Sequence, residues 1–252
     1  MKKIIMRLVI ALVVLIILAV LAVGLFLDTA IKRGVETFGP KLTKVDIKLN
    51  SVNLSIISGS GSIKGLVVGN PEGFKEPSAI SVGAASLALK PSSLLSDKIV
   101  IKSIKVQGPE ITYETNLKTS NLQKILANVQ EATGSSGKEP AKPQEPAQPK
   151  EAKPAKKLQV DEFIIAGGKV NVSVTGLGGG AATIPLPDIH LKDLGAGPEG
   201  ITAGELVKRV LEAIEKGAMQ AASGSVVDVG GMGSNAVQKV TEGILSPFKK
   251  KK

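Results

Sequence analysis

The chain has 252 residues, no Cys and no Trp, and a formal net charge of +10. Without thiols it forms neither disulfides nor thiolate metal sites. The excess positive charge lies in residues 1–7, in the Lys-rich stretch 137–157 and in the Lys tail 249–252. The remainder is neutral and has few aromatic residues, which argues against nucleic-acid binding.

An uncharged apolar run at residues 8–27 follows the basic tail 1–7. As a helix it matches the hydrocarbon thickness of a bilayer, and it exceeds the apolar region of a cleavable signal. We therefore expect an uncleaved transmembrane anchor. Basic residues flank both sides equally, so the orientation rests on the short tail and the long following domain, which predict a cytoplasmic N-terminus and an external body.

Residues 28–131 are expected to form a β-rich module. A short helix is predicted at 28–38, ending at Gly39-Pro40, and an amphipathic helix at 122–129. Apolar residues alternate with polar ones in the predicted strands, with a phase slip at Ser51 that indicates a bulge or turn. These strands lie at 45–56, 63–68, 80–89, 99–106 and 110–114, and a helical turn is predicted at 91–96.

Residues 132–157 are rich in Pro, Lys, Glu and Ala, a composition typical of an extended linker. Residues 158–194 then return to strand patterns. Their apolar positions and glycine repeat those of 99–113 at a spacing of 59 residues, which favours an internal repeat of a strand-turn-strand unit.

Residues 195–252 are expected to hold helices and the Lys tail. Thr202 and Glu205 have the spacing of a capping box and precede an amphipathic helix that should end near Lys216. A last helix is expected at 237–245.

The anchor, the strand, Gly-Pro and strand pattern of 99–113, and the helix that follows at 121–126 resemble the AsmA-like family of bacterial envelope proteins. The likeness covers roughly residues 1–129, and a weaker likeness extends over 158–174. It implies a mainly β (α+β) fold, in which a transmembrane helix precedes a twisted, antiparallel-type sheet or groove with a few amphipathic helices. It also implies a single-pass protein of the inner membrane with its body in the periplasm, and an apolar groove lining.

Asp188, His190 and Asp193 form the one carboxylate and imidazole cluster. An ordinary half-buried strand explains them better than a metal site, because a third ligand with suitable spacing is missing. His190 would also be the base of any nucleophilic triad, and no Gly-x-Ser-x-Gly motif accompanies it. We therefore expect no catalytic residue, no metal and no cofactor.

The functional hypothesis is an envelope-facing, non-enzymatic module that binds membrane lipid or assists envelope assembly, with envelope proteins as further partners. The alternative is a structural module that binds a protein, the cell wall or anionic head groups without an apolar groove. The candidate groove residues are apolar and belong to the two repeats: Ile99, Ile101, Ile104, Val106, Leu158, Val160, Phe163 and Ile165.

Overall fold

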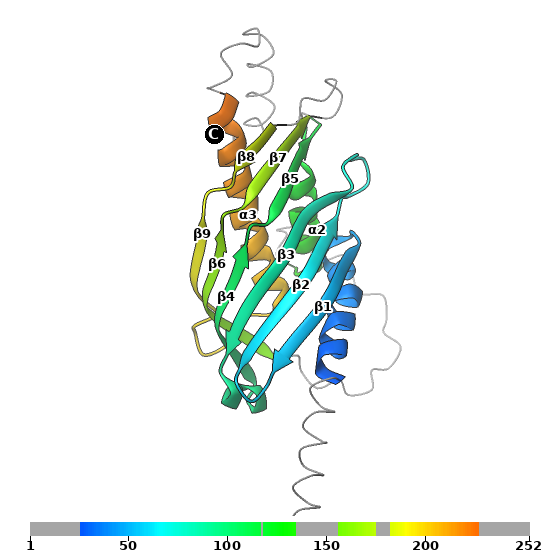
Figure 1. Ribbon diagram of the computed structural model, residues 1–252. Coiled ribbons are helices and arrows are strands. Elements are labelled where there is room, and N and C mark those ends of the chain that lie inside the picture. The colour runs from blue at the N-terminus through cyan, green and yellow to red at the C-terminus, as the bar shows by residue number, and fades with distance from the viewer. Residues whose placement is uncertain (1–25, 117, 135–155, 175–181, 227–252) are drawn as a thin grey trace, which may run out of the picture.

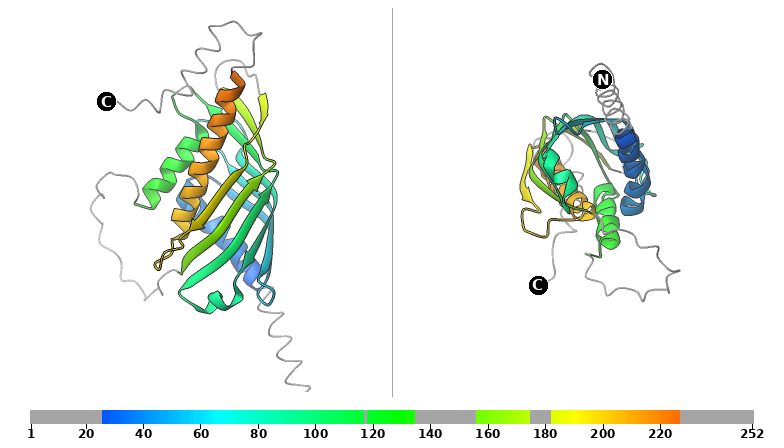
Figure 2. Two further views of the ribbon diagram at one scale, coloured as in Figure 1. Left: turned by 90° about the vertical axis from the view of Figure 1, so that its left-hand side faces the viewer. Right: turned by 90° about the horizontal axis from the view of Figure 1, so that it is seen from below.

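A computed structural model describes residues 26–116, 118–134, 156–174 and 182–226. They form a sheet curled into a half-barrel, with α2 and α3 across its open side and the helix of residues 26–43 alongside β1 (Figures 1 and 2). The elements in chain order are β1 (Ile47–Ser55), β2 (Ser60–Gly69), β3 (Ser78–Leu89), η1 (Pro91–Leu95), β4 (Lys98–Gln107), β5 (Glu110–Thr115), α2 (Asn121–Ala132), β6 (Lys157–Ala166), β7 (Lys169–Val174), β8 (Ala182–Pro185), β9 (Ile189–Leu194) and α3 (Ala203–Val226). The mainly β expectation is confirmed.

Several of these strands are halves of longer ones. β4 and β5 both pair with β3 in a single register, with Leu87 opposite Ile104 and Ile80 opposite Ile111. They are therefore one long strand interrupted at Gly108-Pro109. β6 with β7, and β9 with β8, are related in the same way. The sheet order is thus β1, β2, β3, β4/β5, β6/β7 and β9/β8.

The two sequence repeats lie side by side in this sheet. β4 and β6 are parallel, as are β5 and β7, and each residue is opposite the one 59 positions later. The expected antiparallel-type sheet is wrong at these two pairings, and the sheet is mixed. The chain between β5 and β6 contains α2 and returns to the end where β4 began, and such a crossover produces parallel neighbours.

A line of irregular positions crosses the sheet at one level. In a regular strand, every second side chain lies on the same face. At this level, successive side chains on the helix-facing side are three residues apart instead, as are Val82 and Ala85. Gly65, Gly108 and Gly167 have positive φ at this level, which glycine adopts without steric cost. The register aligns Asn50, Gly65, Gly83, Gly108, Gly167 and Pro187, and we call them the glycine line. The phase slip predicted at Ser51 belongs to it.

The core lies between the concave face of the sheet and helices α2 and α3. α2 begins with a capping box at Ser120 and buries Leu122, Ile125 and Val129. The capping box of α3 at Thr202 and Glu205 is confirmed, since each backbone N–H donates to the side chain of the other residue.

α3 runs to Val226, well beyond the predicted end near Lys216. Its second half carries small residues, and Ala218 and Ala222 are buried against the rest of the core. A Cβ at Gly217 would lie 3.3 Å from Leu186 Cδ1, so the helix lies close to the strands. Tertiary packing thus extends a segment whose own helix propensity is weak.

The helix that precedes β1 continues to residue 43, so the predicted end at Gly39-Pro40 is wrong. Pro40 contributes no N–H to the helix, but the Thr43 hydroxyl donates to the Gly39 carbonyl at 2.9 Å. Lys44 N–H also donates to the Pro40 carbonyl, which closes the last turn.

Several predicted segments lie outside the described residues: the tail 1–7, nearly all of the anchor 8–27, most of the linker 132–157, the helix 237–245 and the Lys tail. Within the described ranges, no helix is both long enough and apolar enough to cross a membrane. The strands predicted at 158–194 extend the same sheet as those of 28–131.

Candidate functional site

The glycine line divides the concave face into two parts. The upper part is formed by the first half of β1, the second half of β2, the first half of β3, and β5, β7 and β8. The other part, which we call the lower concave face, consists of Val52, Leu54, Ile63, Ala85, Leu87, Leu89, Ile99, Ile101, Ile104, Val106, Leu158, Val160, Phe163, Ile165, Ile189, Leu191 and Leu194.

Apolar residues cross the lower concave face in rows that run over all six long strands. One such row, given by the register, is Leu54, Gly61, Leu87, Ile104, Phe163 and Leu191. The glycine does not interrupt it, because a Cβ at Gly61 would lie 2.6 Å from Leu54 Cδ1 and 3.1 Å from Leu87 Cγ. These leucines therefore fill the space above it, and the row presents an unbroken apolar surface.

The eight residues predicted from the sequence form four cross-strand pairs in the middle of this face. The pairs are Ile99 with Leu158, Ile101 with Val160, Ile104 with Phe163 and Val106 with Ile165. A register shift between β3 and β4 keeps Ile101 and Ile104 on one side although three positions separate them.

Burial differs among these eight residues. Val106, Val160, Phe163 and Ile165 are buried in the core, whereas Ile99, Ile101, Ile104 and Leu158 are half-buried.

The upper and lower parts also differ in how the helices cover them. α2 lies against β5, and α3 lies against β5, β7 and β8 of the upper part and against β9, which belongs to the lower part. On the upper part Ile111 and Val170 are fully buried. On the lower part, by contrast, Ile104 is half-buried, although it lies on the same long strand as Ile111. Its neighbour Leu87 and Leu191 at the far edge of the sheet are also half-buried. Partial exposure of apolar side chains therefore concentrates on the lower concave face.

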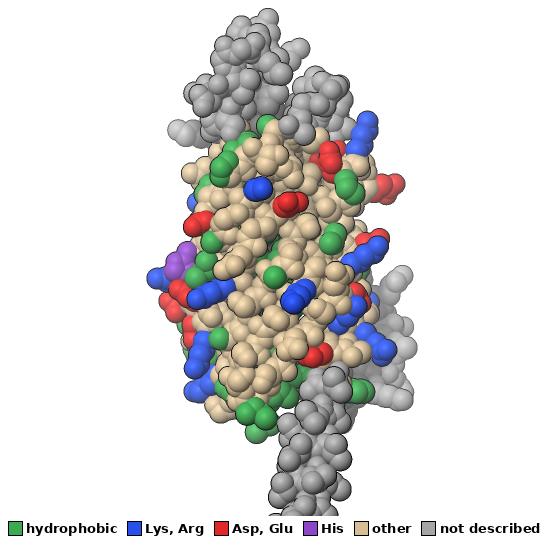
Figure 3. All heavy atoms as spheres, in the orientation of Figure 1, with side chains coloured by type: hydrophobic (Ala, Val, Ile, Leu, Met, Phe, Trp, Pro, Cys, Tyr) green, Lys and Arg blue, Asp and Glu red, His purple; other side chains and the backbone are tan. Residues whose placement is uncertain are grey.

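The outer face of the sheet is polar in character. Figure 3 shows mainly polar and backbone atoms with scattered Lys, Arg, Asp and Glu side chains. Lys105, which follows Ile104, is exposed there, as is Ser86 beside Leu87. The sheet is thus amphipathic, with its apolar side turned inward.

A buried carboxylate lies at the upper end. Glu114 is 1% exposed and accepts hydrogen bonds from the backbone N–H groups of Lys75 and Glu76 and from the Asn70 side chain. Asn121, also buried, donates to Asn70 Oδ1 and accepts from the Glu114 N–H. This network ties the β2–β3 loop to β5 and α2, so its role is structural.

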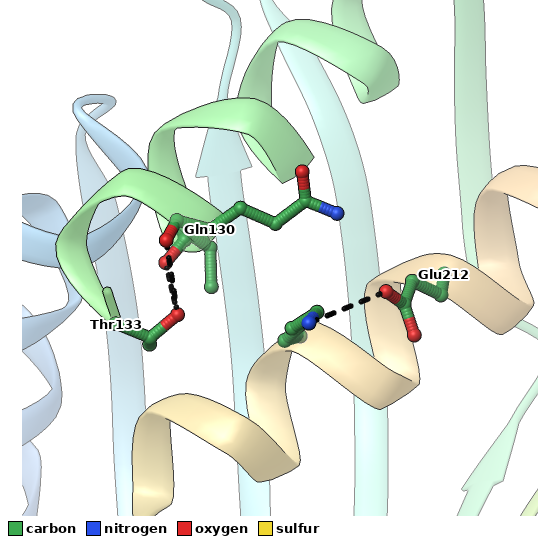
Figure 4. Close-up of polar contacts among 5 residues, drawn as sticks. Gln130, Thr133 and Glu212 are labelled. Atoms are coloured by element: carbon green, nitrogen blue, oxygen red, sulfur yellow. Dashed lines mark hydrogen bonds and ion pairs between the residues drawn. The ribbon is translucent and has the colours of Figure 1, made fainter. Parts of the chain in front are cut away.

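A pocket of about 360 Å³ lies between α2 and α3, lined by Thr119, Gln123, Leu126, Ala127, Gln130 and Glu215. Burial raises the pKa of the Glu215 carboxyl, although a hydrogen bond with Gln123 opposes the rise. Figure 4 shows neighbouring polar groups: Thr133 Oγ1 donates within α2, and Glu212 of α3 lies 4.0 Å from Lys208 Nζ. No convergent catalytic arrangement accompanies Glu215 among the residues lining the pocket.

The carboxylate and imidazole cluster is dispersed over the surface. His190 Nε2 lies 2.8 Å from Glu162 Oε1 and both side chains are partly exposed. Asp188 instead accepts a hydrogen bond from the Gly167 N–H at the glycine line. Among the described residues, no group of His, Asp or Glu could hold a metal ion.

Sequence reasoning missed the side chains that cover the open edge of the sheet. Asp28 Oδ1 accepts from the Leu54 N–H at 2.8 Å, and Glu36 Oε1 accepts from the Leu49 N–H at 3.0 Å. Lys32 Nζ donates to the Asn50 carbonyl. The four-residue spacing of Asp28, Lys32 and Glu36 was visible as one helix face, but nothing local showed that it faces a strand edge.

A curled, mainly β body with an apolar inner face is the kind of module that the sequence resemblance implied. The sequence model of the AsmA family matches residues 1–176, and the chain belongs to this family. The match includes β6 and β7, so it reaches beyond the likeness seen at residues 1–129. Family membership associates the chain with the bacterial envelope. No curated protein and no solved structure matches it significantly.

Proposed function

We propose that this protein is a single-pass inner-membrane protein whose periplasmic body binds lipid acyl chains on the lower concave face and thereby assists envelope assembly. It acts by binding and without catalysis. The membrane anchor is residues 8–27, and the partners are membrane lipids and further envelope proteins.

The observation that carries the proposal is the apolar row through Leu87 and Ile104. It extends over every long strand of the sheet, yet several of its members stay half-buried. Apolar area of this kind favours contact with other apolar groups, by roughly 25 cal/mol per Å² removed from water. A lipid acyl chain is long, flexible and apolar, so it suits an apolar row of side chains that offers no specific polar group.

The arrangement of Glu114 and His190 supports binding rather than chemistry. Glu114 is fully engaged in holding the β2–β3 loop, and His190 pairs with Glu162 on the exposed outer face. Neither group faces the lower concave face. Recognition of an acyl chain needs neither a nucleophile nor a base.

Photo-crosslinking tests this proposal with matched positions on opposite faces. A photoreactive amino acid at Ile104 or Leu87 should capture lipid in intact cells. The same amino acid at Lys105 or Ser86, one position away on the outer face, should capture several-fold less. Crosslinks from Ile104 only to the same chain would contradict lipid binding and favour the module that binds a protein, the cell wall or head groups.

A further inference from the structure

Three large apolar side chains project into solvent from separate segments. Leu95 in η1 is 95% exposed, and Ile57 in the β1–β2 turn and Phe26 are each 80% exposed. Isolated exposed apolar residues are normal on a protein surface, so exposure alone carries little weight. Their shared position is the informative feature.

All three lie at one end of the half-barrel. Asp28 bonds to the Leu54 N–H, which places the start of its helix beside the last residues of β1 and thus beside the β1–β2 turn. Gly59 of that turn accepts a hydrogen bond from Leu89, and a Cβ at Gly59 would lie 3.0 Å from Pro91, the first residue of η1. Figure 1 shows these three segments together at the lower end, and in Figure 3 hydrophobic side chains gather there. We call this end the apolar pole.

Basic groups lie around η1 at the apolar pole. Lys90 and Lys98 flank η1 and outnumber Asp97 in the same segment. Lys156 Nζ donates to the Leu94 carbonyl, and Lys98 Nζ donates to the loop before α3. An exposed apolar tip flanked by Lys side chains, as in η1, is the pattern expected at an anionic bilayer surface.

The connectivity of the chain also indicates that the partner of the apolar pole is a bilayer. Phe26 lies at the C-terminal end of the uncharged run 8–27, the segment predicted to enter the bilayer. The apolar pole is therefore the part of the body nearest to that membrane. Three single side chains on three separate tips suit insertion into a fluid interface better than docking on a shaped protein surface.

We propose that the apolar pole rests on the bilayer, with Ile57 and Leu95 inserted among the lipid chains as contacts additional to the anchor. The lower concave face reaches this pole, because β1 and β3 end there and β4 and β6 begin there. The inference rests on the proposed function for the presence of the membrane and of acyl chains. It adds the route by which lipid reaches the sheet, which is directly from the leaflet beneath the pole.

The absence of Trp from the chain makes a background-free test possible. The variants Leu95→Trp and Ile57→Trp would be made in the full-length protein and reconstituted into phosphatidylcholine and phosphatidylglycerol vesicles that contain brominated acyl chains. We expect blue-shifted emission with strong bromine quenching. The control Glu72→Trp, in the exposed β2–β3 loop at the opposite end, should be neither shifted nor quenched.

Two results separate this inference from the proposed function. If Leu95→Trp and Ile57→Trp are quenched no more than Glu72→Trp, the membrane contact is refuted, even where a crosslinker at Ile104 captures lipid. Strong quenching at both positions without capture at Ile104 supports the contact and refutes lipid binding on the lower concave face. If lipid reaches the sheet through the pole, Leu95→Asp should lower lipid capture at Ile104 roughly tenfold, because burial of one such side chain changes a binding equilibrium by about that factor. The variant should still be found in the membrane pellet.

Discussion

Gly108 and Gly167 lie opposite each other on adjacent parallel long strands, and both have positive φ, 57° and 65°. Gly108 N–H donates to the Ala166 carbonyl, so the two breaks are joined directly. Equivalent residues of the two repeats thus interrupt their strands at one level, and the glycine line extends this level across the sheet. The line marks the boundary between the upper part and the lower concave face.

Gly167→Ala should lower the free energy of unfolding by about 1–2 kcal/mol, the cost of a left-handed conformation for an L-residue with a side chain. Apart from the adjacent residues along the chain, no heavy atom of the described residues would lie within 4 Å of a Cβ at Gly167, so a clash makes no contribution. Denaturant unfolding followed by circular dichroism measures the change.

Gly83 provides the matched control for this effect. It lies on the same line, an added Cβ also meets nothing within 4 Å, and its φ is not positive. Gly83→Ala should therefore be neutral or slightly stabilising. Equal losses at Gly83 and Gly167 would show that the backbone conformation is not the cause.

Asp28→Ala and Glu36→Ala should each cost about 1–3 kcal/mol, because each removes a charged acceptor from a backbone N–H on the open edge of β1. Hydrogen exchange should accelerate at the Leu54 amide in the first variant and at Leu49 in the second. Thr37→Ala, an exposed change on the same helix, should leave both amides unaffected. Unchanged exchange in Asp28→Ala would mean that the helix does not protect this edge.

Glu114→Gln should destabilise the protein by about 1–3 kcal/mol, although the side chain keeps its size. The new NH₂ group would face the Lys75 N–H at the position of Oε1, or the N–H groups of both Lys75 and Glu76 at the position of Oε2, so a donor meets a donor in either orientation. The exchange of these two amides should rise more than that of distant strands. Glu110→Gln, an exposed substitution on the same strand, should be nearly neutral, and similar losses in the two variants would argue against the network.

Glu215→Gln should stabilise the protein at neutral pH. Burial raises the pKa of the folded carboxyl above its ordinary value of 4.5, so the folded state binds a proton that the unfolded state releases. The parent protein therefore loses stability as pH rises from the ordinary pKa through the raised one, and the variant does not. Below about pH 4 both states are largely protonated and the difference should vanish.

Unfolding titrations across this pH range measure the Glu215 effect. Glu131→Gln, an exposed change on α2, should follow the parent curve. A stability difference between Glu215→Gln and the parent that does not vary with pH would show that the carboxyl is not titrating differently in the folded state.

Much of this fold follows from local sequence signals. Alternating apolar residues in 99–106 and 158–165 predicted strands with one apolar side, and the spacing of Thr202 and Glu205 predicted the start of α3. These signals act over a few residues, because side-chain alternation and capping depend on neighbours along the chain. The 59-residue repeat was visible for the same reason, as a pattern copied within one sequence.

Tertiary structure alone decided how the repeats combine. Parallel pairing of β4 with β6 depends on where the chain returns after α2, and this is a long-range event that no local pattern encodes. It also decided that Val160 is buried while its partner Ile101 stays half-buried, since burial depends on which helix covers each position. The pairing of Asp28 and Glu36 with the edge of β1 has the same origin: backbone groups left open by the sheet are satisfied by whichever element packs beside them.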